Sequence, residues 1–175
     1  MNFVILDLEW NPSYSKKLKG FINEIIEFGA IKVNSDLEII DTFSALVRPQ
    51  IGKKLNEKIT TLTHITDEDV EDGCTYTHAL SGFRKFLGDS VLMTWGITDI
   101  YVLMENTKYF LQDDRLYFID NYTNLQDYCE DMLIQKNIKK NEKSAGKQMG
   151  LTTATELLSL YTHLRAHETS AHLVC

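Results

Sequence analysis

This sequence has few cysteines, few prolines and no excess of basic residues, and each of these features argues against a class of protein. The three cysteines, Cys74, Cys129 and Cys175, are widely spaced and form no C-x-x-C pair, so neither a zinc site nor a disulfide framework is indicated. There are only two prolines, and 43% of the residues are hydrophobic and 25% charged, which is typical of a globular rather than a disordered or fibrous chain. The formal net charge of -7 argues against a protein that grips nucleic acid through a broad basic surface.

Long apolar runs are also missing. No segment approaches the roughly 20 apolar residues that a membrane-spanning helix needs. The first residues lead directly into an acidic strand, without a basic region or a cleavage site. We therefore expect a protein that is neither secreted nor embedded in a membrane, and a reducing cytoplasm fits the scattered cysteines best. A length of 175 residues favours a single domain over residues 1–175.

Two acidic residues follow the first apolar run of the chain. Residues 2–6 have the composition of a buried strand. Asp7 and Glu9 would share one face of that strand while Leu8 points to the other. Two carboxylates side by side repel, so burying both requires a divalent cation or a shared proton. The alternative is that both lie in solvent beyond the strand end.

The remaining pattern predicts an α/β fold. Residues 11–20 are interpreted as a surface loop, and residues 23–34 and 37–49 as two strands joined by a turn at 34–36. Further strands are predicted at 90–96 and 116–121. Helices are predicted within 55–66, after Thr66, at 76–87, 97–111, 123–137 and 151–175. These elements indicate a mixed β-sheet, with three antiparallel strands followed by parallel strands, flanked by helices.

Two further acidic residues have competing interpretations. Asp99 lies in the first turn of the helix that follows the strand 90–96, where open α/β sheets bind ligands. The alternative is a helix N-terminal charge that interacts with the macrodipole. Glu27 interrupts an apolar run, and we favour a hydrogen-bonded structural glutamate over a metal ligand at this position. The negative net charge does not exclude a nuclease, because bound cations invert the field that a phosphodiester meets.

Six motifs make the sequence similar to the DEDD superfamily of 3′-to-5′ exonucleases. They occur in the family's order and cover roughly the first two thirds of the chain: VILDLEWN at 4–11, EIIEFGAI at 24–31, FSALVRP at 43–49, LTHIT at 62–66, FRKFLG at 83–88 and TWGITDI at 94–100. The sequence most resembles the DEDDh branch, close to ERI-type exonucleases and their bacterial relatives. The resemblance implies a ribonuclease H-like fold and hydrolysis of phosphodiester bonds at the 3′ end of single-stranded RNA or DNA, with a nucleoside monophosphate as product.

The resemblance also implies a set of site residues. Asp7 and Glu9 match the first family motif and Asp99 matches the carboxylate of the second, so the three would hold two Mg²⁺ or Mn²⁺ ions. Two such ions about 4 Å apart activate the attacking water and stabilise the leaving 3′ oxygen. Leu8 and Trp10 would seat the terminal nucleotide. Trp95 is a candidate for stacking, with a buried core tryptophan as the alternative.

The third family motif is altered in this chain. His163 and Glu168 have the separation of the family's histidine base and last metal ligand, but the alanine between them, Ala166, stands one place too late. His167, the alternative base, is followed five residues later by His172 instead of an acid. Replacing the family's aspartate by a longer glutamate shifts an ion by about one bond, and such misplacement costs roughly a hundredfold in rate.

The end of the chain adds a second departure. No helix breaker precedes the histidine, and we expect that part of the family's last helix is absent. A catalytically impaired relative, which keeps the nucleic-acid cleft but lacks an intact third motif, is therefore the alternative function. The sequence predicts neither a choice between RNA and DNA nor an oligomeric state.

Overall fold

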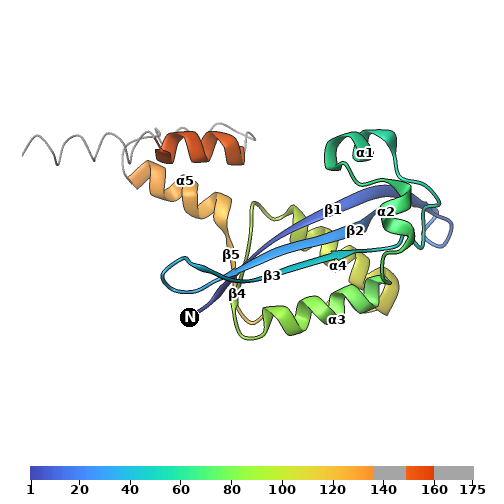
Figure 1. Cartoon of the computed structure of the whole chain (residues 1–175), viewed down its shortest axis with the longest axis horizontal. Coiled ribbons are helices and arrows are strands. Elements are labelled where there is room, and N and C mark those ends of the chain that lie inside the picture. The colour runs from blue at the N-terminus through green and yellow to red at the C-terminus, as the bar shows by residue number, and fades with distance from the viewer. Residues whose placement is uncertain (136–148, 160–175) are drawn as a thin grey trace, which may run out of the picture. The chain divides into compact units, whose positions relative to one another are not determined.

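The computed structural model describes residues 1–135 and 149–159 of the chain (Figure 1). It divides into two compact units, residues 1–123 and 124–175, which are described separately. The predicted candidates His163 and Glu168 lie outside the described residues. A single domain over the whole chain stays a prediction.

A five-stranded mixed sheet is the framework of the fold, and it confirms the predicted α/β class. Its spatial order is β3-β2-β1-β4-β5. The strands pair antiparallel between β1 and β2 and between β2 and β3, whereas β4 runs parallel to β1. Their bounds are β1 Phe3–Ser15, β2 Gly20–Val33, β3 Ile39–Leu46, β4 Val91–Thr94 and β5 Tyr122–Asn124.

The first strand is much longer than the sequence indicated. Residues 11–20 were expected to form a surface loop, but β1 continues to Ser15, which pairs with Gly20 of β2. Asn11, Ser13 and Ser15 are buried on alternate positions of this extension. Their polar side chains find partners there, since Asn11 accepts a hydrogen bond from the Asn56 N–H at 2.8 Å and Ser15 contacts the Tyr109 hydroxyl at 3.2 Å. The prediction was wrong because buried polar residues resemble a loop in sequence.

The helices begin at the residues that local capping rules select. Asn56, Thr66 and Thr75 each accept a backbone N–H at the start of a helix, and Thr66 forms a capping box with Asp69. The helices of the first unit are α1 Glu57–Thr63, α2 Asp67–Glu71, α3 Tyr76–Leu87 and α4 Thr98–Leu111. The second unit contains α5 Leu125–Gln135, and residues 151–159 are also helical.

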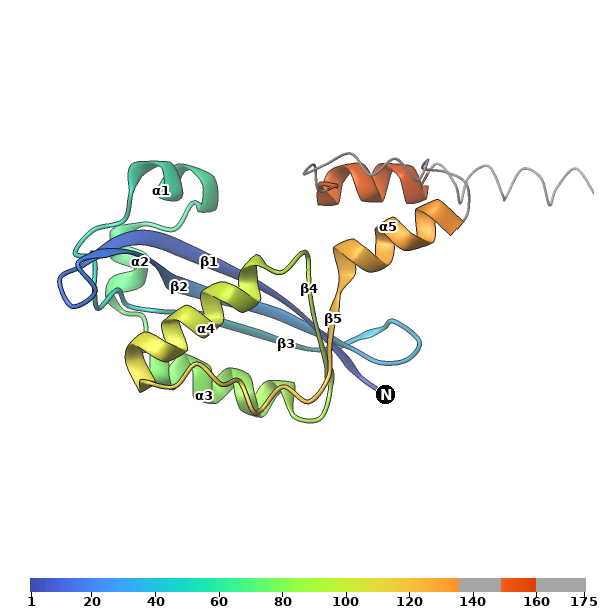
Figure 2. The ribbon, with the colours of Figure 1, turned by 180° about the vertical axis from the view of Figure 1, so that it is seen from behind.

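The two faces of the sheet have separate cores. The helices α3 and α4 cover one face (Figure 2), where side chains of β1 such as Leu6 and Leu8 pack with Phe28, Phe83 and Leu103. Fully burying one such side chain contributes about 1.5–3 kcal/mol. The other face has a smaller core, made of Ile26, Leu55, Ile65 and Val70, under the short helices α1 and α2.

A β-bulge explains how neighbouring residues of β2 serve both cores. The register between β1 and β2 shifts between Glu9, which pairs with Glu27, and Trp10, which pairs with Ile25. Ile26 is the extra residue, because two residues of β2 then face one step of β1. Ile26 consequently packs with the smaller core, whereas Ile25 and Phe28 pack with the larger one.

Two buried polar side chains attach the surrounding segments to β2. Asn106 of α4 accepts the Ile25 N–H at 3.1 Å and donates to the Asn23 carbonyl oxygen at 2.7 Å. The Glu24 carboxylate is 1% exposed and accepts the backbone N–H groups of three consecutive residues, Gln50, Ile51 and Gly52. These bonds satisfy backbone groups of β2 and of the segment between β3 and α1 that have no partner within regular secondary structure.

The segment before β5 differs from the prediction. Residues 116–121 do not form a strand, since the Ile119 N–H donates to the Leu116 carbonyl oxygen in a turn and β5 begins only at Tyr122. Leu116, Phe118 and Ile119 pack against the larger core from this turn, so their apolar character was mistaken for a strand. Asn124 caps the next helix, because its side-chain oxygen accepts the Gln126 N–H at 3.0 Å.

The second unit is held by contacts around Met149. Its carbonyl oxygen accepts a hydrogen bond from the Gln126 side chain at 2.6 Å, and its N–H donates to Glu130 at 3.1 Å. Leu133, Met149 and Ala154 are buried. Within the described ranges of the chain, none of the helices has both the length and the apolar character needed to cross a bilayer.

Candidate active site

Asp7 and Glu9 lie in the middle of β1, on the face opposite to the larger core. The alternation of the strand places Leu6 and Leu8 in that core, so Asp7 and Glu9 point to the other face. Across the β1–β2 ladder, Asp7 stands beside Gly29 and Glu9 beside Glu27. Asp7 is exposed and Glu9 is half-buried.

A braced turn brings Asp99 to the same part of β1. The strand β4 ends at Thr94, and the chain turns through Gly96, whose φ of 84° lies in the region that favours glycine. The Thr94 and Tyr122 hydroxyls both donate to the Gly96 carbonyl oxygen. The turn ends in α4, which carries Asp99 in its first turn, where the helix dipole favours a negative charge.

Asp99 is hydrogen-bonded to the backbone between the two strand carboxylates. The Leu8 N–H donates to Asp99 Oδ1 at 3.1 Å, and Asp99 is only 6% exposed. This contact joins residues that are 91 positions apart in the sequence. The structure therefore places the Asp99 carboxylate beside β1 at Leu8, the residue between Asp7 and Glu9, and the assignment of the three as metal ligands stays a prediction.

Desolvation raises the pKa of all three carboxyl groups, and neighbouring negative charges raise that of Glu9 and Asp99 further. Although the Asp7 side chain reaches solvent, the surrounding protein atoms partly desolvate its carboxylate and raise its pKa. Burial also raises the pKa of Glu9, and the negative charges of Asp7, Glu27 and Asp99 raise it further. The pKa of Asp99 is raised mainly by burial and also by Asp7, although the hydrogen bond from the Leu8 N–H lowers it. The site is thus a group of like charges that a cation would stabilise.

The described residues supply no basic side chain to compensate this charge. The ion pairs found in that part of the chain are Lys108–Asp114 and Arg115–Asp113, both beyond the first turns of α4. Mg²⁺ and Mn²⁺ prefer hard oxygen ligands, which negatively charged carboxylates without a basic partner supply. The chemistry of the three side chains therefore fits a divalent ion.

The three carboxylates do not form a finished metal site as they stand. Among residues 1–135 and 149–159, no three Asp, Glu, His or Cys side chains are arranged to hold one ion. The assignment of Asp7, Glu9 and Asp99 to a shared ion therefore stays a prediction.

Glu27 is an acidic neighbour whose place the sequence did not reveal. It stands opposite Glu9 at the bulge and raises the pKa of that residue. The Ser44 hydroxyl donates to Glu27 Oε1 at 3.4 Å, in agreement with the structural role favoured from the sequence. Its proximity to Glu9 depends on the register of β1 and β2, for which the sequence has no local signal.

The predicted nucleotide-binding residues are only partly accessible. The Leu8 side chain is 2% exposed in the larger core, and its backbone N–H binds Asp99. Trp10 is half-buried against the same core, and Trp95 is also half-buried. The assignment of these three residues to substrate binding stays a prediction.

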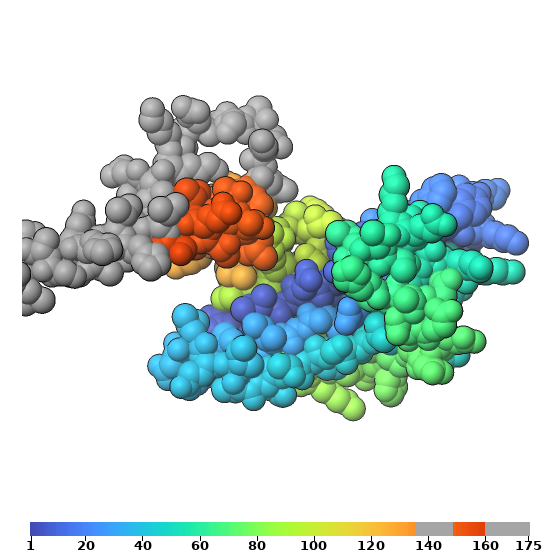
Figure 3. Space-filling view, turned by 45° about the horizontal axis from the view of Figure 1, so that its top comes forward, coloured from blue at the N-terminus to red at the C-terminus, as the bar shows by residue number. Residues whose placement is uncertain are grey.

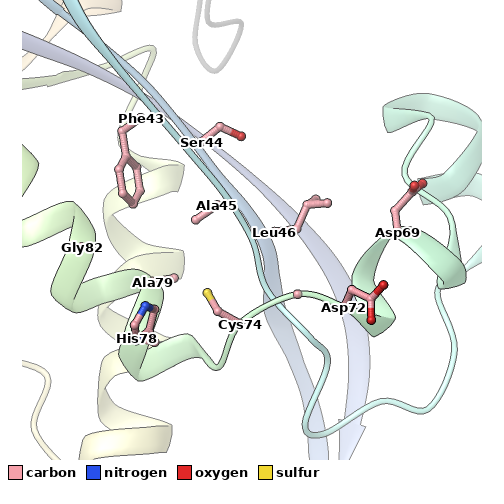
Figure 4. Close-up of a pocket in the computed structure, with 11 residues that line it drawn as sticks. Phe43, Ser44, Ala45, Leu46, Asp69, Asp72, Cys74, His78, Ala79 and Gly82 are labelled. Carbon is pink, nitrogen blue, oxygen red and sulfur yellow. The ribbon is translucent and has the colours of Figure 1, made fainter.

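A groove on another edge of the sheet contains none of the predicted site residues. It has a volume of about 600 Å³ and lies between the edge strand β3 and the helix α3 (Figure 4). Phe43, Ser44 and Leu46 line it from β3 and His78 from α3, with Asp72 near one end. Because β2 separates β3 from β1, this groove is distinct from the carboxylate site.

The family comparison covers most of the chain. Residues 4–156 match the RNase T family, which is described as exonuclease. The probable 3′-5′ exonuclease KapD of Bacillus subtilis (strain 168) is 30% identical over 111 residues, which are 62% of this chain and 54% of KapD. This chain therefore spans about half the length of that curated relative.

Solved structures give the same assignment. The nuclease domain of 3′hExo, a DEDDh family member bound to rAMP, superposes with a TM-score of 0.62 and 26% identity, over 72% of this chain and 67% of that chain. Cell-death related nuclease 4 (CRN-4) superposes with a TM-score of 0.69 over 93% of this chain and 55% of its own, and its 16% identity supports the fold alone. These matches confirm the ribonuclease H-like fold and the family resemblance seen in the sequence. The chain belongs to the RNase T family of exonucleases.

Proposed function

We propose that the protein is a divalent-metal-dependent 3′-to-5′ exonuclease that removes nucleoside monophosphates from the 3′ ends of single-stranded RNA or DNA. The observation that supports this proposal is the hydrogen bond from the Leu8 N–H to Asp99, which holds that carboxylate near Asp7 and Glu9, so that neighbouring negative charges raise the pKa of Glu9 and Asp99. Next to α1, atoms of β1 and β2 are exposed at the surface (Figure 3). Because the chain belongs to an exonuclease family, hydrolysis of a phosphodiester bond is the reaction that we propose for this acidic site.

The proposed roles follow from the contacts of each residue. Asp7, Glu9 and Asp99 would hold two Mg²⁺ or Mn²⁺ ions, which supply an activated water and stabilisation of the leaving 3′ oxygen when bound. The Leu8 N–H fixes the orientation of Asp99 through Oδ1. We assign the general base to His163 and a fourth ligand to Glu168 on their spacing, and Trp10 to the terminal nucleotide.

The proposed activity is tested with a 5′-labelled oligonucleotide and Mn²⁺. The protein should produce a ladder that shortens from the 3′ end, and Asp7→Ala should abolish it. His163→Ala should remove most of the activity if this residue is the base. Asp89→Asn, which changes an exposed carboxylate of the α3–β4 turn, is the matched control and should leave the ladder intact. An intact substrate with the unaltered protein would refute the proposed reaction.

A second candidate function rests on the altered third motif. A relative that lacks the histidine base would still bind a 3′ end through the carboxylates and their ions. In the same assay, such a protein would leave the oligonucleotide intact but retard it in a native gel in the presence of Mn²⁺. Loss of that retardation in Asp99→Asn would assign the binding to the carboxylate site.

A further inference from the structure

The turn between β1 and β2 concentrates positive charge in an acidic protein. We call residues 14–21, which end β1 and begin β2, the hairpin tip. It contains Lys16, Lys17 and Lys19, and all three side chains are exposed. No acidic residue occurs between Trp10 and Asn23, although the whole chain has a net charge of -7. The hairpin tip is therefore a local basic site on a negative molecule.

Exposed apolar side chains lie among these lysines. Tyr14 is 54%, Leu18 is 52% and Phe21 is 73% exposed. Tyr14 and Phe21 face each other across the hairpin, with their ring centroids 5.5 Å apart in an edge-to-face arrangement. Aromatic rings interleaved with lysines are the surface on which single-stranded nucleic acids bind, because bases stack on the rings and phosphates pair with the cations.

The hairpin tip is fixed to the C-terminal end of α4. Lys17 Nζ donates to the Tyr109 carbonyl oxygen at 3.2 Å and lies 4.8 Å from the centroid of the Tyr109 ring. The Leu18 N–H donates to Ser15 Oγ, which also contacts the Tyr109 hydroxyl. Lys17 is thus engaged in the structure, whereas no ion pair of Lys16 or Lys19 is found in the described part of the chain. A fixed tip places these two charges at a defined distance from the site.

Two elements connect the hairpin tip to the carboxylates. The helix α4 starts beside Leu8 through Asp99 and ends beside Ser15 through Tyr109, so it runs alongside β1 from the site to the tip. The ten steps of α4 from Asp99 to Tyr109 span about 15 Å. The seven steps of β1 from Glu9 to Lys16 span about 23 Å. The separation between the carboxylates and the tip is thus about 15–23 Å, which several nucleotides of a single strand can span.

We propose that the hairpin tip binds the single strand upstream of the 3′ end, with Lys16 and Lys19 on phosphates and Tyr14 and Phe21 against bases. This inference rests on the proposed exonuclease function, because it takes the carboxylates as the position of the 3′ end. The occupant is a single strand, since stacking on an exposed ring requires an unpaired base. A nearby groove of about 550 Å³ adjoins this surface along α4; it is lined by Lys17, Leu18, Glu105, Lys108, Tyr109 and Gln112, and Lys108 there is paired with Asp114.

Equilibrium binding of a labelled single-stranded dodecanucleotide in EDTA tests the surface without cleavage. For K16Q/K19Q, the slope of log affinity against log salt should become shallower by about 1.4, because each phosphate contact with a single strand contributes about 0.7. K53Q/K85Q removes two exposed lysines elsewhere and should keep the original slope. Phe21→Ser should weaken binding by about fivefold or more, whereas Tyr117→Ser, at another exposed ring, should not.

Cleavage of substrates of two lengths distinguishes this inference from the proposed function. A dinucleotide is too short to reach the hairpin tip, so the ratio of kcat/KM for the dodecanucleotide to that for the dinucleotide should fall in K16Q/K19Q. An unchanged salt slope together with an unchanged ratio would overturn the inference while the exonuclease function stands. Failure of the unaltered protein to cleave either substrate would refute the exonuclease function, and the salt slope in EDTA would still decide the inference.

Discussion

The Glu24 carboxylate makes a specific prediction about how the segment before α1 is held. Oε1 accepts the N–H groups of Gln50 at 2.6 Å and Ile51 at 2.7 Å, and Oε2 accepts that of Gly52 at 2.9 Å. In Glu24→Gln, one of the two oxygens becomes an NH₂ group that cannot accept a hydrogen bond. Whichever way the amide is turned, at least one backbone N–H faces another donor.

The magnitude follows from the change in these three bonds. Hydrogen bonds to a charged group contribute about 1.5–3 kcal/mol and neutral ones about 0.5–1.5 kcal/mol, so the two retained bonds of Glu24→Gln lose about 2 kcal/mol together. The third N–H loses its acceptor at a further cost of about 1–3 kcal/mol. The cheaper burial of a neutral amide offsets part of this loss. We expect a net loss of about 3 kcal/mol in the free energy of unfolding.

Denaturation and amide exchange measure the effect of Glu24→Gln. The midpoint temperature should fall by about 6–12 °C for a chain of this size, and the Gln50, Ile51 and Gly52 amides should lose protection from hydrogen exchange. Glu38→Gln, which changes an exposed glutamate bound to the Asn34 side chain, should alter stability by less than about 0.5 kcal/mol. If Glu24→Gln is as stable as Glu38→Gln and its three amides remain protected, the reasoning is refuted.

Three other substitutions test the packing around the sheet. Asn106→Leu leaves the Ile25 N–H without its acceptor and should cost about 3 kcal/mol in urea denaturation; a loss below about 1 kcal/mol would contradict the attachment of α4 to β2. Gly73→Ala places a Cβ atom 2.8 Å from the Arg48 backbone nitrogen, so we expect a loss of about 1–3 kcal/mol, and an unchanged melting temperature would refute this close contact. Tyr122→Phe removes the hydroxyl that hydrogen-bonds the turn after β4 and should lower the free energy of unfolding by about 1 kcal/mol. An unchanged midpoint in thermal denaturation would contradict this role of the hydroxyl.

Local signals made part of this structure predictable. Thr66 and Thr75 mark the starts of α2 and α3 in the sequence, because a capping side chain binds backbone groups only two or three residues away. The shared face of Asp7 and Glu9 was also predictable, because side chains alternate between the two faces of a strand. The order of strand, turn and helix placed Asp99 in the first turn of α4, but its association with this pair was taken from the family resemblance.

Features that depend on distant partners were not predictable. Asn11 and Ser13 are buried because the segment before α1 covers the extended β1, and their polarity alone indicated a loop. Glu27 stands beside Glu9 because of the bulge at Ile26. No residue type in this part of the sequence predicts that bulge. The apolar residues before β5 serve the core from a turn, so composition without pairing gave the wrong element.

The most direct test of the carboxylate site is a calorimetric titration of the protein with Mn²⁺. The unaltered protein should bind Mn²⁺, and Asp99→Asn should weaken that binding by at least about tenfold, because it removes one charged oxygen ligand while the amide oxygen still accepts the Leu8 N–H. Asp89→Asn should bind as the unaltered protein does. Equal Mn²⁺ affinity in Asp99→Asn and in the unaltered protein would contradict the claim that Asp7, Glu9 and Asp99 share their ions.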